Sequence, residues 1–336
     1  RGSAPAGAES EPLLSSNADG LHSARMRKGP IVEQSFFEAM HDDGIAIHGR
    51  YSQVIKADAS SLVINRNSFR NGDPIRFFDT SGKPAGEAIV KDVQLLKEFQ
   101  NERKTQRMSR SDNASGPYWK VALVREVSID FDYLASNPNA GGRGYVIRNT
   151  TIKNHRGRGM LLKADDGLVE GSTVDGSTMG GIVLTPEFDW NESCYSRNVT
   201  LRKNTIRNVA YWDRPWAAMI IAAIDRKPVS GRGHQGIVID GNTFDAVNGT
   251  NLFISSANGV TVRNNRFIKP QQKKITPGNP DWGVDAGSLI YVTEADNVDM
   301  DNNVIVGRGS VTRQLLQATP TSRVKGMKDG LREQQR

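Results

Sequence analysis

A short pattern recurs along the chain and restricts its possible folds more than any other feature. It reads apolar, x, apolar, x, x, Asn or small polar, x, apolar. Clear copies begin at Val199, Ile237, Val260 and Val298, and weaker copies begin at Pro30, Tyr145 and Gly167. The small polar position is filled in turn by Thr150, Ser172, Asn204, Asn242, Asn265 and Asn303. These residues are 22, 32, 38, 23 and 38 positions apart, so the base period is 22 or 23 residues and longer steps hold loops.

A second short apolar segment follows most copies of the pattern. The segments are GMLLK, GIVLT, AMIIA, NLFIS and SLIYV. Each coil therefore holds at least two β-strands, and stacked coils bury the apolar face that one coil leaves exposed. Stacked Asn side chains can form hydrogen-bonded ladders. We predict an all-β fold, a right-handed parallel β-helix. A leucine-rich repeat is the nearest alternative, but the recurrent Leu-x-Leu and a helix in each repeat are missing.

The repeat also divides the chain. Coils are expected over residues 13–50 and 141–314. Residues 51–140 interrupt the repeat with short alternating strands between Gly, Pro and Asp turns, which predicts an inserted small antiparallel β-barrel or sandwich. Residues 1–12 and 315–336 are expected to be a disordered end and a tail. Because the chain begins with Arg1 rather than Met, we expect a fragment or a processed form.

The composition restricts the classes of partner that the chain is expected to bind. The net charge is +7, but Lys and Arg are scattered, and the sequence has no basic helix, zinc finger or aromatic-basic platform. We therefore expect no nucleic-acid partner. No apolar run approaches 18 residues, so no membrane-spanning helix is expected. Cys194 is the single cysteine, which excludes an internal disulfide and predicts a packing role for its side chain. No cofactor is predicted.

Acidic residues gather at one position of the repeat. The stretch DDGIAIHG, from Asp42 to Gly49, has the form of a second strand with its entry turn, and Asp19 lies 23 residues before Asp42 in a stretch of the same shape. Neighbouring coils stack about 4.8 Å apart. Asp19, Asp42 and Asp43 are therefore expected to form a cluster of three carboxylates on one edge of the helix.

A second acidic stretch lies two coils further on. TPEFDWNES contains Glu187, Asp189 and Glu192, roughly 10 Å from Asp43 if each coil adds one strand spacing. His48 is expected to point outward beside Lys163 in the next coil. Carboxyl groups about 6.5–9.5 Å apart leave room for a water molecule and suit inverting glycoside hydrolysis. Crowding among carboxylates raises at least one pKa, which keeps an acid protonated near neutral pH.

Two alternative interpretations of the aspartates remain open. Asp-Gly is common turn chemistry, and DDG occurs again at Asp165, where we favour a simple turn. Clustered aspartates can also hold calcium, but the rest of an oxygen cage is not visible in the sequence, so no metal site is predicted.

The order of these parts resembles glycoside hydrolase family 110. The shared features are a coil with Asp-Asp-x-x-x-apolar-His-Gly, then a small inserted barrel, then NHRGRGMLLKADDGLVEG, and then an acidic, Trp-containing loop. The resemblance covers roughly Asn17 to Val209. It implies an exo-acting, inverting α-1,3-galactosidase on a β-helix, with an extracellular or periplasmic location. This chain departs from the family pattern at Ala46, where Asn is usual, and in an acidic loop that is one residue shorter and contains Pro186.

The resemblance also implies roles for residues. Asp19, Asp42 and Asp43 match the functional aspartates of the family, and Asp42 and Asp43 would position or activate water. Glu187 is the first choice for the acid partner and Asp189 the second. The remaining candidates for substrate binding are His48, Arg156, Arg158, Lys163, Trp190, Glu192 and Trp212. Aromatic side chains such as Trp190 suit the apolar faces of sugars, and they equally cover the ends of cores.

Three functions compete at this point. The first is a hydrolase that acts on an oligo- or polysaccharide with a terminal α-linked sugar, galactose in particular. The second is a polysaccharide lyase or epimerase on acidic glycans, in which Arg158 and Lys163 would neutralise a carboxylate or abstract a proton. The third is a glycan-binding β-helix without catalysis, which would tolerate Asp42→Asn. A fold by itself does not decide among them.

Overall fold

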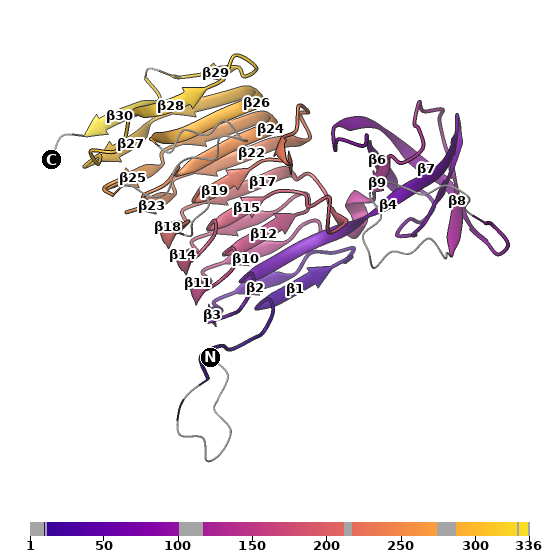
Figure 1. Cartoon of the computed structure of the whole chain (residues 1–336), viewed down its shortest axis with the longest axis horizontal. Coiled ribbons are helices and arrows are strands. Elements are labelled where there is room, and N and C mark those ends of the chain that lie inside the picture. Colours follow the sequence, from indigo (N-terminus) through magenta and orange to yellow (C-terminus); the bar gives the residue numbers. More distant parts are fainter. Residues whose placement is uncertain are drawn as a thin grey trace.

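The computed structural model describes residues 10, 12–100, 117–211, 217–273, 287–327 and 329–334. Three parallel β-ladders wind around one long axis and form a parallel β-helix, and an antiparallel barrel extends from one side near its N-terminal end (Figure 1). Within the described part of the chain, no helix is long and apolar enough to cross a membrane.

The first ladder consists of the strands formed by the recurring pattern. It stacks β2 (Ile31–Glu33), β10 (Val146–Arg148), β13 (Leu168–Glu170), β17 (Arg197–Arg202), β22 (His234–Asp240), the later halves of β24 (Leu252–Arg263) and β26 (Ser288–Asp301), and β29 (Val324–Lys325). Its register advances by 22, 32, 38, 23 and 38 residues from Ile147 to Met300, which confirms the predicted repeat.

The other two ladders complete each coil. The second stacks β1 (Leu21–Ala24), β4 (Ile45–Asp58), β12 (Met160–Lys163), β15 (Ile182–Leu184), β19 (Met219–Ile221), the first halves of β24 and β26, and β28 (Gln314–Ala318). The third stacks β3 (Phe36–Glu38), β11 (Thr151–His155), β14 (Thr173–Ser177), β18 (Thr205–Val209), β23 (Thr243–Asp245), β25 (Arg266–Ile268), β27 (Asn303–Val306) and β30 (Leu331–Gln334).

Residues of the same type stack inside the helix. Phe244 and Phe267 stack with their ring centroids 4.9 Å apart, and both are fully buried in the continuous apolar core. At the bend after the first ladder, buried asparagines donate from the side-chain nitrogen to the side-chain oxygen of the Asn in the next coil, at 2.9–3.0 Å. The series runs from Asn204 through Asn242 and Asn265 to Asn303. The predicted Asn ladder is therefore present, and it satisfies polar groups that burial would otherwise leave unpaired.

The inserted domain is a closed barrel rather than an open sandwich. Its six strands are the later half of β4, β5 (Ser61–Ile64), β6 (Pro74–Phe78), β7 (Pro84–Leu96), β8 (Tyr118–Leu123) and β9 (Leu134–Ser136). Pairing runs β4–β5–β8–β7–β6–β9 and returns to β4, so these strands leave no open edge. A 3₁₀ helix, η1 (Pro138–Ala140), leads back to the coils.

A continuous strand and a buried ion pair are among the links between the barrel and the coils. Strand β4 runs without a break from the second ladder into the barrel. In addition, Arg76 on β6 donates to both carboxylate oxygens of Asp165, at 3.2 and 2.6 Å, and both side chains are buried. Asp165 therefore does more than form the turn expected of its Asp-Asp-Gly stretch. Cys194 packs beside Arg76 and is buried, as predicted.

The chain ends differ from expectation where they are described. The predicted tail from residue 315 is wrong, because β28, β29 and β30 extend all three ladders by a further coil. The weak sequence pattern there hid this coil. The predicted disordered end, residues 1–12, lies almost wholly outside the described residues. The described elements also include a short hairpin of β20 (Ile224–Asp225) and β21 (Lys227–Pro228). The remaining strand, β16 (Glu192–Ser193), pairs with β4.

Candidate active site

The three aspartates lie together at the entrance to the second ladder. Because β1 and β4 pair with Leu21 opposite Ile45, Asp19 stacks on Asp43, 24 residues away. The Asp43 backbone N–H donates to Asp19 Oδ1 at 3.1 Å. Carboxylate oxygens of Asp19, Asp42 and Asp43 all lie within 4.8 Å of one another. The structure thus brings together the cluster that the repeat spacing indicates.

Close packing of the backbone makes this cluster possible. Gly44 follows Asp43 directly, and a Cβ atom at Gly44 would lie 2.5 Å from the Gly159 carbonyl oxygen of the next coil. A larger residue would force the coils apart. Glycine is therefore required at this position of the turn, and an aspartate that precedes it, as in Asp19-Gly20 and Asp43-Gly44, lies on the same edge of each coil.

The cluster alters the proton affinity of its members. Loss of solvent raises the pKa of Asp42 above its ordinary value, and the neighbouring negative charge of Asp43 raises it further. Burial and Asp43 also raise the pKa of Asp19, although its contact with His22 partly offsets this. Carboxyl groups of this kind exchange protons closer to neutral pH than isolated ones do.

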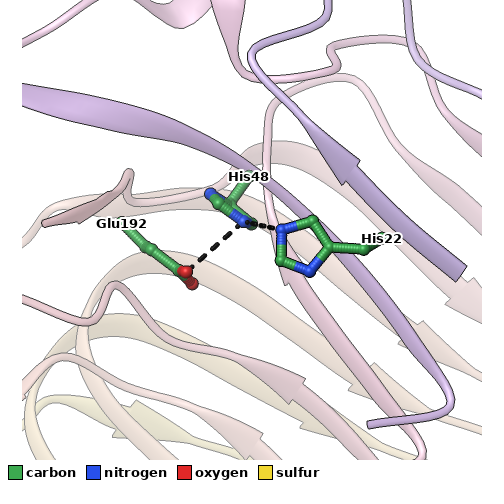
Figure 2. A group of neighbouring side chains, drawn as sticks. All are labelled: His22, His48 and Glu192. Atoms are coloured by element: carbon green, nitrogen blue, oxygen red, sulfur yellow. Dashed lines mark hydrogen bonds and ion pairs between the residues drawn. The ribbon is translucent and has the colours of Figure 1, made fainter. Parts of the chain in front are cut away.

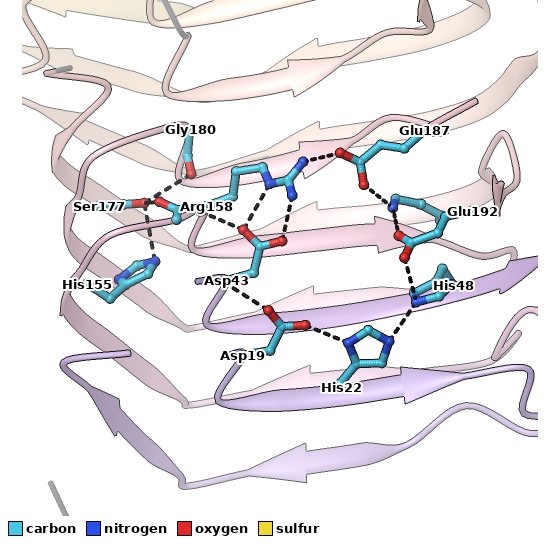
Figure 3. A network of polar contacts seen from close by, with 12 residues as sticks. Asp19, His22, Asp43, His48, His155, Arg158, Ser177, Gly180, Glu187 and Glu192 are labelled. Atoms are coloured by element: carbon cyan, nitrogen blue, oxygen red, sulfur yellow. Dashed lines mark hydrogen bonds and ion pairs between the residues drawn. The ribbon is translucent and has the colours of Figure 1, made fainter. Parts of the chain in front are cut away.

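Arg158 joins the aspartates to the acidic loop (Figure 3). Its backbone N–H and Nε donate to Asp43 Oδ1 at 2.7 and 2.9 Å, and its Nη2 lies 2.9 Å from Asp43 Oδ2. Its Nη1 donates to Glu187 Oε1 at 2.6 Å. One guanidinium therefore holds two carboxylates from different coils in fixed orientation.

Lys163, on β12, also holds the acidic loop. It pairs with His48 in the ladder register, and its side chain is fully buried. Its Nζ donates to Glu187 Oε2 at 2.5 Å and also to Glu192 Oε2. Because Lys163 and Arg158 are both committed to carboxylates of the chain, neither is placed to neutralise a uronate, which speaks against the lyase interpretation.

These ion pairs change the role of Glu187. Burial alone would raise the pKa of Glu187, but Arg158 and Lys163 outweigh it and lower the pKa to about 2. A proton donor must be protonated at the working pH. The acid role predicted for Glu187 is therefore disfavoured, because two cationic neighbours that the sequence did not reveal hold its carboxylate in the ionised form.

Two histidines, shown with Glu192 in Figure 2, connect Asp19 to the other end of the loop (Figure 3). His48 Nε2 lies 2.8 Å from His22 Nε2 and 3.4 Å from Glu192 Oε1, and His22 Nδ1 lies 2.7 Å from Asp19 Oδ2. His48 is buried, and burial lowers its pKa. His22 was not among the predicted site residues, because the repeat places it opposite Ala46 rather than opposite another polar residue.

A pocket of about 290 Å³ opens beside the aspartates, lined by His41, Asp42, Arg156, Gly157 and Met179. Arg156 Nη1 lies 2.6 Å from His41 Nε2, so the predicted Arg156 does lie at the cluster. A Cβ atom at Gly157 would come within 2.7 Å of Asp43 Oδ1, so glycine is needed there. Asp42 is the only one of the three aspartates among these lining residues.

The acidic loop itself is anchored on the barrel. Backbone hydrogen bonds of 3.1 and 3.0 Å join Glu187 and Glu192 across its base, and the Phe188 ring stacks on Tyr51. Asp189 and Trp190 lie at its tip and are exposed, Trp190 by 71%. Trp212, the other aromatic candidate, lies outside the described residues.

Known proteins resemble this chain along much of its length. Alpha-1,3-galactosidase B of Akkermansia muciniphila is 26% identical over 267 residues, 75% of this chain and 32% of that protein. Alpha-1,3-galactosidase A of Bacteroides fragilis (strain YCH46) is 24% identical over 284 residues, 80% of this chain and 44% of that protein. This chain therefore spans less than half of the length of each of these two relatives.

Structural comparison gives only distant likeness. The surface adhesin PfbA of Streptococcus pneumoniae matches with a TM-score of 0.33 and 14% identity, over 57% of this chain and 55% of that one. The sequence model of the right-handed β-helix region, in contrast, matches residues 139–317, more than half of the chain. Together with the three parallel ladders, this match shows that the chain belongs to the right-handed β-helix family.

Proposed function

We propose that this protein is an exo-acting glycoside hydrolase that removes a terminal α-linked galactose from a glycan. The observation that supports it most is the cluster of Asp19, Asp42 and Asp43 within 4.8 Å, with Asp42 at an open pocket. The similarity of the chain to alpha-1,3-galactosidases agrees with galactose as the sugar and with an α-linkage as the bond that is cleaved. An extracellular or periplasmic location, also proposed, would give the enzyme access to such glycans.

Asp42 is assigned the role of general base. Its raised pKa makes it a stronger proton acceptor than an ordinary aspartate, and it faces the pocket in which a water molecule would attack. Asp43 is fixed by Arg158, and Asp19 is fixed by His22, so these two carboxylates form fixed surroundings for Asp42, which alone of the three lines the pocket.

The proton donor belongs on the opposite side of the sugar. In an inverting enzyme the two carboxyl groups are about 6.5–9.5 Å apart, and the three aspartates lie closer together than this. The acidic loop offers Glu187, Asp189 and Glu192. Glu187 and Glu192 are engaged by Lys163, whereas Asp189 is exposed and takes part in none of the described ion pairs. Asp189, the second choice from the sequence, is therefore proposed as the acid.

The test is hydrolysis of unmodified α-linked galactosides by the full chain and by Asp42→Asn, with the released sugar followed by NMR. Release of β-galactose by the parent, with a rate about 10²–10⁴-fold lower in Asp42→Asn, supports an inverting hydrolase with Asp42 as its base. Initial release of α-galactose would refute inversion. Equal rates in both proteins would refute Asp42 as the base. Absence of release in the parent would refute the hydrolase itself and favour a glycan-binding function.

A further inference from the structure

His22 and His48 are in contact, and the proposed reaction does not fix the protonation state of either imidazole ring. Each ring directs its Nδ1 at a hydrogen-bond acceptor: Asp19 Oδ2 lies 2.7 Å from His22 Nδ1, and the Gly49 carbonyl oxygen lies 2.8 Å from His48 Nδ1. Neither acceptor can donate to an imidazole, apart from a protonated Asp19. The geometry therefore places a proton on Nδ1 of each ring and leaves a lone pair on each Nε2.

The two lone pairs nevertheless point at each other. His22 Nε2 and His48 Nε2 are 2.8 Å apart, and the rings meet edge to face (Figure 2). Two lone pairs at this distance repel unless something positive lies between or beside them. Either one imidazole carries a second proton or a cation is bound by both nitrogens.

A third donor completes the group. Glu192 Oε1 lies 3.4 Å from His48 Nε2, and because Lys163 engages the other oxygen, Oε2, the Oε1 atom remains directed at the histidines. Donor atoms of all three residues lie within 4.8 Å of one another. Two imidazole nitrogens and one carboxylate oxygen are the ligand set that zinc and similar ions accept.

The surroundings of the group match those of metal ligands. Histidines that bind metals donate their other N–H to a carboxylate or a backbone carbonyl, which fixes the tautomer and the ring orientation. His22 has a carboxylate partner and His48 a carbonyl partner. The contacts around the group join four carboxylates (Asp19, Asp43, Glu187 and Glu192) to two cations (Arg158 and Lys163), which leaves two negative charges when the histidines are neutral.

We propose that His22, His48 and Glu192 bind one divalent transition-metal ion of the zinc type. Zn–N bonds of about 2.0–2.1 Å at tetrahedral angles place two nitrogens roughly 3.3 Å apart, so the rings need to separate by only about half an ångström. His22 can move, because half of its side chain is exposed. The inference does not depend on the proposed hydrolase activity.

The ion would fasten three segments that are distant in sequence. His22 lies on β1, His48 on β4, and Glu192 at the start of β16, at the base of the acidic loop. Asp19, which holds His22, also accepts from the Asp43 backbone. Metal binding would therefore fix the first coil, the loop and the aspartate cluster relative to one another, and it would stabilise the folded chain by mass action.

The experiment uses the purified full chain, stripped with EDTA, dialysed and titrated with Co²⁺, with Zn²⁺ as competitor. We expect one Co²⁺ per chain, with the visible absorption of a four-coordinate site, displaced by one equivalent of Zn²⁺ and accompanied by a higher melting temperature. His22→Gln should lose the band and the thermal shift. It replaces a half-exposed side chain, and circular dichroism checks that it is folded.

His41→Gln is the matched control, because His41 contacts Arg156 and lies outside the proposed ligands. It should bind Co²⁺ as the parent does. Absence of a stoichiometric band in the parent, or equal loss in His41→Gln and His22→Gln, would overturn the proposal and leave a shared proton as the explanation of the contact. Because no step of the experiment measures hydrolysis, its result is separate from that of the proposed function.

Discussion

Lys163 Nζ lies 2.5 Å from Glu187 Oε2 although no part of the Lys163 side chain is exposed. The same ammonium group also reaches Glu192 at the other end of the loop base. A buried charge is tolerated only where it is paired. The acidic loop is therefore held on β12 by one lysine, and the geometry of the site depends on that residue.

Replacement of Lys163 by Met should be strongly destabilising. Two partly buried carboxylates would lose their shared cation, and removal of one partner of a buried pair costs about 3–5 kcal/mol. Urea unfolding of the variant and the parent measures the difference. Lys56→Met is the control, since Lys56 is exposed on the same strand as His48 and its loss should cost no more than about 0.5 kcal/mol. Equal effects of the two substitutions would contradict the assigned role.

The depressed pKa of Glu187 predicts a pH dependence of stability. Its pKa is about 2 in the folded chain and 4.5 ordinarily, so its ionised form favours the folded state. This contribution is complete above pH 4.5 and is lost as pH falls toward 2. The free energy of unfolding of the parent should therefore decline with falling pH in this window. In Glu187→Gln the decline should be shallower, and parallel curves for the two proteins would refute the assignment.

The fold could be predicted in detail because the repeat encodes it directly. Each Asn of the ladder marks the same bend, so the spacing from Asn204 to Asn303 gives the pairing register of the coils. The same repeat predicts that Asp19 meets the Asp42/Asp43 pair. In the structure its direct partner is Asp43, one residue beyond the Asp42 that a step of 23 residues indicates. The final coil was missed because its strands, such as β28, are half-buried and lack the alternation of the inner coils.

The site was less predictable, for a physical reason. Ion pairs depend on how far long side chains reach between coils, and a repeat pattern contains no information on this. Arg158 reaches both Asp43 and Glu187, and its contact with Glu187 stabilises the ionised carboxylate, which disfavours the acid role expected from the sequence. His22 contacts His48 diagonally, two residues out of register, and pattern alignment compares only residues that are directly opposite.

The Asn ladder should contribute measurably to stability. Asn242 accepts from the backbone and side chain of Asn204 and donates to the Leu201 carbonyl and to Asn265. Asn242→Ala would leave several buried groups unpaired, each at a cost of about 1–3 kcal/mol. We expect a loss of at least about 2 kcal/mol in urea unfolding. Thr243→Ala, at the half-buried next residue, should cost clearly less, and a similar cost at both positions would argue against the ladder.

The proposed base predicts the direction of a pH shift in activity. A general base must be ionised, so kcat/KM should fall as pH drops through the pKa of Asp42, which lies above its ordinary 3.8. Part of that elevation comes from loss of solvent and part from the charge of Asp43. Asp43→Asn removes the second part, and the acidic limb of the profile should then move to lower pH, whatever the variant's maximal rate.

The measurement is kcat/KM for an α-linked galactoside between pH 3 and 8 in the parent, Asp43→Asn and Asp299→Asn. Asp299 is exposed on β26, far along the ladder from the aspartate cluster, and its substitution should leave the acidic limb in place. A limb that stays fixed or rises in Asp43→Asn would show that Asp42 is not the group being titrated. An acidic limb that moves to lower pH in Asp43→Asn but not in Asp299→Asn would identify Asp42 as the titrating group. The substitution of Asp43 changes the charge beside Asp42 and leaves the Asp42 carboxylate itself unchanged.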